Sequence, residues 1–216
     1  ALLESDHVRN AMAASLQKLG ELDEAEEQAR RCVELSRRNE AWALGDLGAV
    51  YRAQGDLERA WALMTEAYEL ARGGLRAHTV IIQINRMDVA VAMGELREAT
   101  RIGRSLETDE VLESDRLRGA LRSLQGVLAQ RAGRWDDAER LGAQAVADLE
   151  GTDFSVWTTA RLRYGHVDLK RGRWDEVSAL LRQVNAWLVE QQAGPRAPIR
   201  LAAEHLHREL KRRRTS

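Results

Sequence analysis

The feature that most constrains the fold is a six-residue pattern that occurs five times. Each copy has a glycine, a Leu or Trp two positions later, and a small Ala or Val five positions after the glycine. The copies are 20–25, 55–60, 94–99, 133–138 and 172–177, with glycines 35, 39, 39 and 39 residues apart. A glycine can take the left-handed conformation that ends a helix, and a small side chain lets two helices come close. The pattern therefore predicts five helical hairpins, each turning at one of these glycines.

Amphipathic stretches lie on both sides of each glycine, as hairpins require. The only prolines are Pro195 and Pro198, so no residue before them lacks the N–H that a helix needs. After the prolines we expect one last amphipathic helix that covers the end of the array. The expected helices are 4–19, 22–38, 40–54, 57–72, 77–93, 96–106, 111–132, 135–150, 154–171, 174–192 and 198–212.

The second hairpin resembles the tetratricopeptide repeat most closely. Its matching packing positions are Leu44, Leu47, Gly48, Tyr51, Gly55, Leu57, Ala60, Ala67 and Leu70. The wider spacing of the other copies is similar to the elongated helical-repeat sensor domains of bacterial signal-transduction ATPases and transcriptional activators. The resemblance implies an all-α fold, a right-handed α-solenoid of about five antiparallel helical hairpins plus a C-terminal capping helix. We expect the repeat array at residues 1–194, and the capping helix with a basic tail at residues 195–216.

Charge and composition exclude several classes of partner. The 33 basic and 34 acidic residues nearly cancel, whereas a nucleic-acid binder needs a basic excess. The one basic run, Lys211 to Arg214, is interpreted as a frayed, solvated tail. No apolar stretch is long enough to cross a membrane, and the single cysteine, Cys32, suits the reducing cytoplasm. The N-terminus lacks an initiator Met, so we expect an excerpt of a longer protein.

Residues for catalysis or cofactor binding are not found in the sequence. There is no glycine-rich phosphate loop, and Cys32 is interpreted as a buried packing thiol at a position that calls for a small residue. His205 and His207 are two residues apart on a helix, whereas a zinc-binding pair needs a spacing of three or four. The sequence thus predicts a chain that is not an enzyme and holds no cofactor or metal.

The six tryptophans could either pack in the core or serve as exposed anchors for a ligand. Trp135 and Trp174 take the position that Leu occupies in the first three turns, so we expect them in the core. For Trp42, Trp61, Trp157 and Trp187 we favour half-buried packing over a role as exposed binding anchors.

In tetratricopeptide arrays, the first helices of successive hairpins line a concave groove. The resemblance implies a ligand groove centred on repeats two to five, with an acidic middle (Asp46, Asp88) and a basic C-terminal end. The candidate groove residues are Asn10, Trp42, Asp46, Arg52, Asn85, Arg86, Asp88, Gln130, Arg163, His166 and Lys170.

Arg86 stands where the repeat has a core leucine. A buried, unpaired guanidinium is costly, so the side chain must find an acidic partner or reach solvent. The preferred interpretation is a local register shift that exposes it. The alternative is a polar pocket in the middle of the groove, where Arg86, Asn85 and Asp88 meet a ligand.

One well-known version of this groove is disfavoured. Tetratricopeptide domains that hold the C-terminal carboxylate of chaperones use a clamp of Lys, Asn and Arg side chains. The corresponding positions here are Asn10, Ala14, Asp46, Ile81 and Asn85, and four of the five lack the required donor or charge.

Three functional hypotheses remain. The leading one is a non-catalytic scaffold whose groove holds a peptide or protein segment, which could be another domain of the same polypeptide. The second is an effector-sensing regulatory domain of a larger bacterial regulator. The third is a self-association module that forms a homo-oligomer. Nucleic acid and membrane are not expected partners in any of them.

Overall fold

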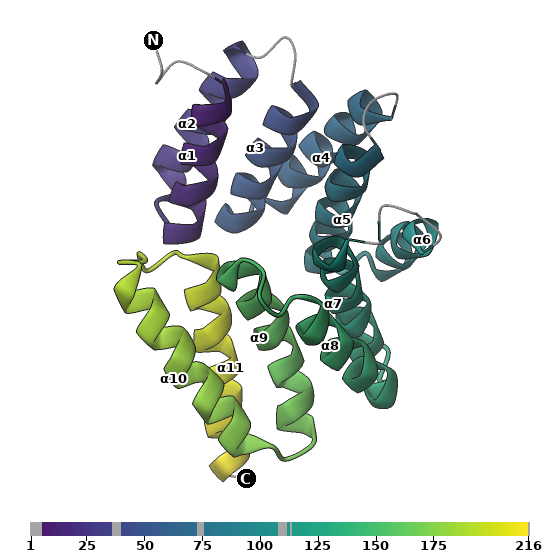
Figure 1. Ribbon diagram of the computed structural model, residues 1–216, viewed down its shortest axis with the longest axis vertical. Coiled ribbons are helices and arrows are strands. Elements are labelled where there is room, and N and C mark those ends of the chain that lie inside the picture. The colour runs from purple at the N-terminus through teal and green to yellow at the C-terminus, as the bar shows by residue number, and fades with distance from the viewer. Residues whose placement is uncertain (1–5, 36–39, 73–75, 108–111, 113, 216) are drawn as a thin grey trace. The chain divides into compact units, whose positions relative to one another are not determined.

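Helices are the regular secondary structure of the chain where the structure describes it. This computed structural model describes residues 6–35, 40–72, 76–107, 112 and 114–215, with the backbone alone for residues 6–10 and 31–35. Those residues form eleven α-helices and no β-strand (Figure 1). None of the described helices combines the length and the apolar character that crossing a membrane demands. The all-α, tetratricopeptide-like fold class is confirmed.

Ten of the helices pair into five consecutive hairpins, and the eleventh follows them. Their bounds are α1 Asp6–Leu19, α2 Leu22–Leu35, α3 Glu40–Gln54, α4 Leu57–Ala71, α5 Arg76–Met93, α6 Leu96–Leu106, α7 Asp115–Arg131, α8 Trp135–Asp148, α9 Phe154–Lys170, α10 Trp174–Glu190 and α11 Pro198–Thr215. The ends of helices at the glycine turns agree with the expected ranges to within two residues.

Two described helix ends differ from the expectation by more than two residues. α7 begins at Asp115 rather than at residue 111, because Ser114 takes an extended N-cap conformation with ψ of 118°. The basic run is exposed, as expected of a solvated tail, but its expected fraying is wrong. α11 continues through Lys211 to Arg214, and the Arg214 guanidinium lies 3.3 Å from Asp175 and 3.2 Å from the Ser178 hydroxyl of α10. Residues 36–38 of the second expected helix lie outside the described residues.

The five glycine turns share one hydrogen-bonded geometry. Gly20, Gly55, Gly94, Gly133 and Gly172 all have φ between 73° and 87°. At Gly55, the N–H of the next residue, Asp56, donates to the Tyr51 carbonyl at 2.9 Å, which closes the end of the first helix. The small residue five positions after each glycine is completely buried: Ala25, Ala60, Ala99, Ala138 and Val177 are each 0% exposed. The predicted role of both positions in the hairpin is confirmed.

The chain divides into two compact units, which are described separately. Unit 1, Ala1–Val111, contains the first three hairpins. α2 packs on α3 and α4 packs on α5, while α3 also contacts α1 and α5. A shared core runs from α1 to α5 and includes Ala13, Leu47, Met64 and Val89.

Unit 2, Leu112–Ser216, contains the last two hairpins and α11. α11 packs against α9 and α10, as Figure 1 shows in its green and yellow part. It therefore occupies the place that the first helix of a following hairpin would take. Gly165 allows this approach, since a Cβ there would lie 2.7 Å from Leu206 Cδ2. Buried Asp168 holds the second hairpin of the unit through Arg161 and Arg173, at 2.6 and 2.8 Å.

The corner tryptophans behave differently from each other. Trp135 is half-buried rather than part of the core as expected, with the Lys170 ammonium from the next hairpin 5.4 Å from its ring centroid. Trp174 is 39% exposed, so its expected place in the core is wrong. It belongs to the last hairpin, and no sixth hairpin follows among the described residues to cover it. The other four tryptophans are half-buried, as expected.

The left-handed turn at Gly55 predicts that alanine has opposite effects on stability at Gly55 and at the helical Gly45. Gly55→Ala should lower the free energy of unfolding by about 1–2 kcal/mol, because φ is +87° while a Cβ would meet no atom within 4 Å. Gly45→Ala, inside α3, should raise it by up to about 1 kcal/mol through helix propensity, since its Cβ would lie a comfortable 3.8 Å from Ile82. Urea unfolding of both variants measures the difference, and equal effects would contradict the left-handed turn.

Candidate functional site

The first helices α3 and α5 lie side by side in unit 1 and carry several of the predicted groove residues. Trp42 Nε1 donates a hydrogen bond to His78 Nδ1 at 2.9 Å. Nearly three turns further along, Arg52 forms an ion pair with Asp88 at 2.6 Å. Trp42, Asp46, Arg52, Asn85 and Asp88 are all half-buried, and we call these five residues the α3–α5 face.

Asp46 is the unusual member of the α3–α5 face. Its carboxyl group has no hydrogen-bond or ion-pair partner among the described residues, and burial raises its pKa from the ordinary 3.8 to about 7. It lies one helical turn after Trp42, on the same side of α3. An ionised Asp46 is therefore a half-desolvated charge beside an aromatic ring, an arrangement that a cationic group of a ligand would stabilise.

In unit 2, the predicted groove residues contact different neighbours. Gln130 Nε2 donates to the Arg163 carbonyl at 3.1 Å, and Arg163 Nη1 lies 3.4 Å from Ser123 Oγ, so both residues join α7 to α9. His166 contacts α11, and Lys170 lies against Trp135 of α8. The side chain of Asn10 lies outside the described residues. A single groove through repeats two to five stays a prediction.

Arg86 is largely buried and faces away from the α3–α5 face. Its side chain is 11% exposed and lies 3.6 Å from Glu98 of α6. The guanidinium stacks on Trp61 and Tyr68 of α4, at 4.6 and 5.3 Å from the ring centroids. Burial lowers the pKa of Arg86, and Glu98 opposes that shift. The expected register shift that would expose Arg86 is wrong. The structure also does not bring Arg86 together with Asp88, which pairs with α3 instead.

A polar cavity of about 420 Å³ lies beside Arg86, between α4, α5 and α6. Two ion pairs hold part of its wall, Arg72 with Glu69 at 2.9 Å and Arg101 with Glu98 at 2.7 Å. Two buried wall atoms, Arg86 Nε and Gln83 Oε1, have no hydrogen-bond partner. We call this space the arginine cavity; its lining residues are Tyr68, Glu69, Arg72, Arg76, Thr79, Val80, Gln83, Arg86, Arg101, Ser105 and Leu106.

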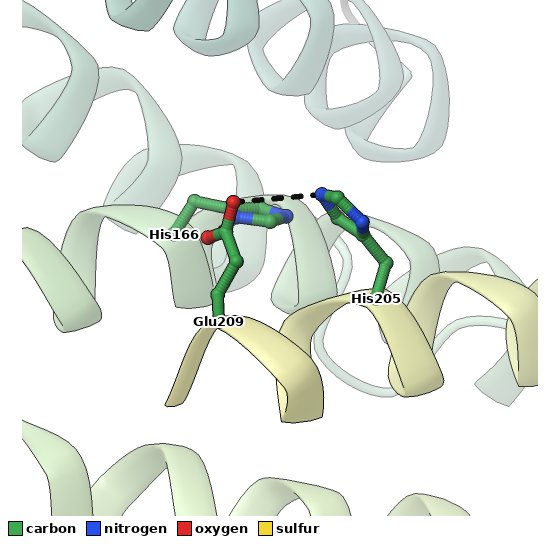
Figure 2. A group of neighbouring side chains, drawn as sticks. All are labelled: His166, His205 and Glu209. Atoms are coloured by element: carbon green, nitrogen blue, oxygen red, sulfur yellow. Dashed lines mark hydrogen bonds and ion pairs between the residues drawn. The ribbon is translucent and has the colours of Figure 1, made fainter. Parts of the chain in front are cut away.

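A second cluster, which the sequence analysis missed, joins α9 to α11. Figure 2 shows the side chains of His166, His205 and Glu209 pointing toward one another. Their ligand atoms all lie within 4.8 Å of one another. The His205–Glu209 pair has the four-residue spacing of a helical chelate, a signal that the spacings between histidines alone do not contain. The contribution of His166 could not be found without the contact between α9 and α11.

Comparison with known proteins identifies the repeat. Residues 4–73, which include the first two hairpins, match the model of the tetratricopeptide repeat. No curated protein matches the chain. The family match and the repeated hairpin geometry support the tetratricopeptide-type array that the sequence predicts. The similarity to bacterial sensor domains stays a prediction.

The burial of Asp46 predicts a pH-dependent stability. Between about pH 4 and pH 7 only the folded chain keeps the Asp46 proton, because burial raises the folded pKa to about 7. Stability should therefore fall as the pH rises through this window and stay reduced above it. Asp46→Asn should match the wild type near pH 4 and exceed it by roughly 2–4 kcal/mol near pH 8.

Urea unfolding at both pH values measures this difference. The control is Glu66→Gln, which removes an exposed carboxylate from α4 of the same hairpin and should leave the pH dependence unchanged. An Asp46→Asn variant with the same stability gain at both pH values would contradict the burial of this charge.

Proposed function

We propose that the chain is a non-catalytic scaffold that binds a peptide or protein segment on the first helices of its hairpins. Tetratricopeptide repeats generally mediate protein–protein interaction, and residues 4–73 match this family. The observation that carries the proposal is the half-buried Asp46 carboxyl group, which has no partner among the described residues. Such a group is stabilised when a binding partner supplies the missing charge or donor.

The chemistry of the α3–α5 face favours a basic segment. Arg52 is already neutralised by Asp88, and His78 accepts a hydrogen bond from Trp42. Asp46 is thus the charge left for a ligand, and Trp42 offers an aromatic surface one turn away. A Lys or Arg side chain, or a free amino terminus, satisfies both features at once. The segment could belong to another domain of the same polypeptide, and the single Cys32 suits a cytoplasmic setting for this interaction.

A displayed library of random peptides, selected on the intact chain, tests this function. Selected peptides should be enriched in Lys and Arg. Asp46→Lys should weaken their binding at least about tenfold, because it places a positive charge against the ligand's own. Glu66→Lys is the matched control, since it makes the same charge change at an exposed position on α4.

The pH dependence of binding gives an independent criterion. Affinity for the selected peptides should rise from about pH 6 to about pH 8, as Asp46 ionises, and this rise should be absent in Asp46→Asn. Peptides that lack basic residues, or that bind Asp46→Lys and Glu66→Lys equally, would refute a basic ligand on the α3–α5 face.

The arginine cavity favours a second candidate function, the sensing of a small effector by a domain of a larger bacterial regulator. A volume of about 420 Å³ is within the range of small-molecule sites. Four arginines and a single acidic residue line the cavity, which favours a small anion as the ligand. Arg86 Nε and Gln83 Oε1 have no partner and are shielded from solvent, so such a ligand would contact them only after a shift of their side chains.

Thermal unfolding with citrate and with sugar phosphates as probes tests the second candidate. A bound anion should raise the melting temperature of the wild type, and this rise should be reduced in Arg72→Gln and Arg86→Gln. Arg97→Gln, an exposed site on α6 outside the cavity, is the control that should respond like the wild type. Arg72 is 61% exposed, so its variant should remain folded if Arg86→Gln does not. A wild-type chain that responds to no probe, or variants that respond fully, would remove the candidate.

A further inference from the structure

Three potential metal ligands come together where α11 crosses α9 in unit 2. His166 Nδ1 lies 2.9 Å from Glu209 Oε2, and His205 Nε2 lies 3.5 Å from Glu209 Oε1. The two imidazole rings are 5.5 Å apart between centroids. Glu209 thus contacts two histidines that come from different helices, and Figure 2 draws the three side chains together.

The packing beneath the cluster holds these side chains in position. His205 and Glu209 are four residues apart on α11, so they lie on one side of that helix. Leu206, the residue after His205, is completely buried and packs against Gly165, the residue before His166. The backbones of α9 and α11 are therefore close and fixed next to the cluster, which limits the reorganisation that ligand binding would require.

The donor set fits a first-row transition metal, and zinc in particular. Two imidazole nitrogens and one carboxylate oxygen are the three-ligand combination of many zinc sites, in which a fourth position stays open for water or another donor. Donors about 2.0–2.1 Å from a tetrahedral zinc ion lie about 3.3 Å from one another. The contacts at 2.9 and 3.5 Å run to different oxygens of Glu209, and one ligand atom from each of the three side chains lies within 4.8 Å of the other two. Rotations of the side chains would therefore suffice to bring the three donors to that separation.

Partial exposure leaves a route for the ion. The side chains of His166, His205 and Glu209 are 28%, 58% and 33% exposed. Imidazole suits zinc, copper and nickel, whereas calcium and magnesium require more oxygen ligands than this cluster offers. We propose that His166, His205 and Glu209 bind one Zn²⁺ ion, which joins α11 to α9 and keeps one coordination position open.

The proposal gives the C-terminal helix a metal-dependent attachment. Without the ion, the contact of Glu209 with His166 links the two helices at this point. With the ion, two imidazoles and the carboxylate share one centre, and separating α11 from α9 then requires that the metal be released. Zinc should therefore stabilise the folded chain in proportion to its occupancy.

Isothermal titration of zinc chloride into the metal-free chain tests the site. We expect one Zn²⁺ per chain with a dissociation constant in the micromolar range. His205→Ala and Glu209→Gln should each weaken binding at least about tenfold. His207→Ala is the matched control, because His207 is exposed on the same helix and is not part of the cluster. It should bind zinc like the wild type.

Further measurements separate this site from other donors and from effects on folding. Cys32→Ser should keep the binding, which excludes the only thiol of the chain. Zinc should raise the melting temperature of the wild type and of His207→Ala but not of His205→Ala, and a chelator should reverse the rise. His205 is mostly exposed, so its variant should fold normally, and circular dichroism checks this. Absence of zinc binding by the wild type, binding unchanged in His205→Ala and Glu209→Gln, or loss of binding in Cys32→Ser would each overturn the proposal.

Discussion

The close approach of two helices at each glycine turn is the constraint on which the rest of the structure depends. The glycine takes a left-handed conformation, and the Ala or Val five residues later has no exposed surface. The glycine determines the direction in which the second helix continues, and the small residue determines how closely it can pack against the first helix. Because each hairpin contacts mainly its neighbours in sequence, the same local solution can be repeated without a long-range core. The faces of the helices are then free to carry different chemistry from one repeat to the next.

Arg86 illustrates how much variation this architecture tolerates. A guanidinium replaces a core leucine, yet α4, α5 and α6 keep their hairpin packing around it. Stacking on Trp61 and Tyr68 and the ion pair with Glu98 compensate for part of the cost of burial. The remaining cost is visible in the unpaired Nε, which lies beside a polar cavity. The substitution of arginine for the core leucine at residue 86 thus accounts both for the departure from the repeat and for the arginine cavity as a candidate binding site.

The helices were predictable from the sequence because their ends depend on local residues. Glycine, the small residue after it and the two prolines define most boundaries without any tertiary information. The environment of a side chain was less predictable, because it depends on contacts between distant residues. Trp174 is exposed, whereas Trp135 at the equivalent turn lies against Lys170 of the next hairpin. The partner of Arg52 is found only when α3 and α5 are placed together. His166 and Glu209 are 43 residues apart, which no spacing rule within one helix could have linked.

Polar contacts between successive first helices recur in both units. Gln17 of α1 donates to the Ala49 carbonyl of α3, and Arg163 of α9 contacts Ser123 of α7. The α3–α5 face and the His166–Glu209 contact belong to the same kind of interface. If the contacts between first helices were wholly apolar, the side chains would pack together as a core and exclude both water and a ligand. Polar pairs can hold neighbouring repeats together while leaving charges such as Asp46 for a partner. α11 packs against α9 in the way that successive first helices pack against each other within a unit. Polar contacts of this kind therefore extend to α11, through His166 and Glu209.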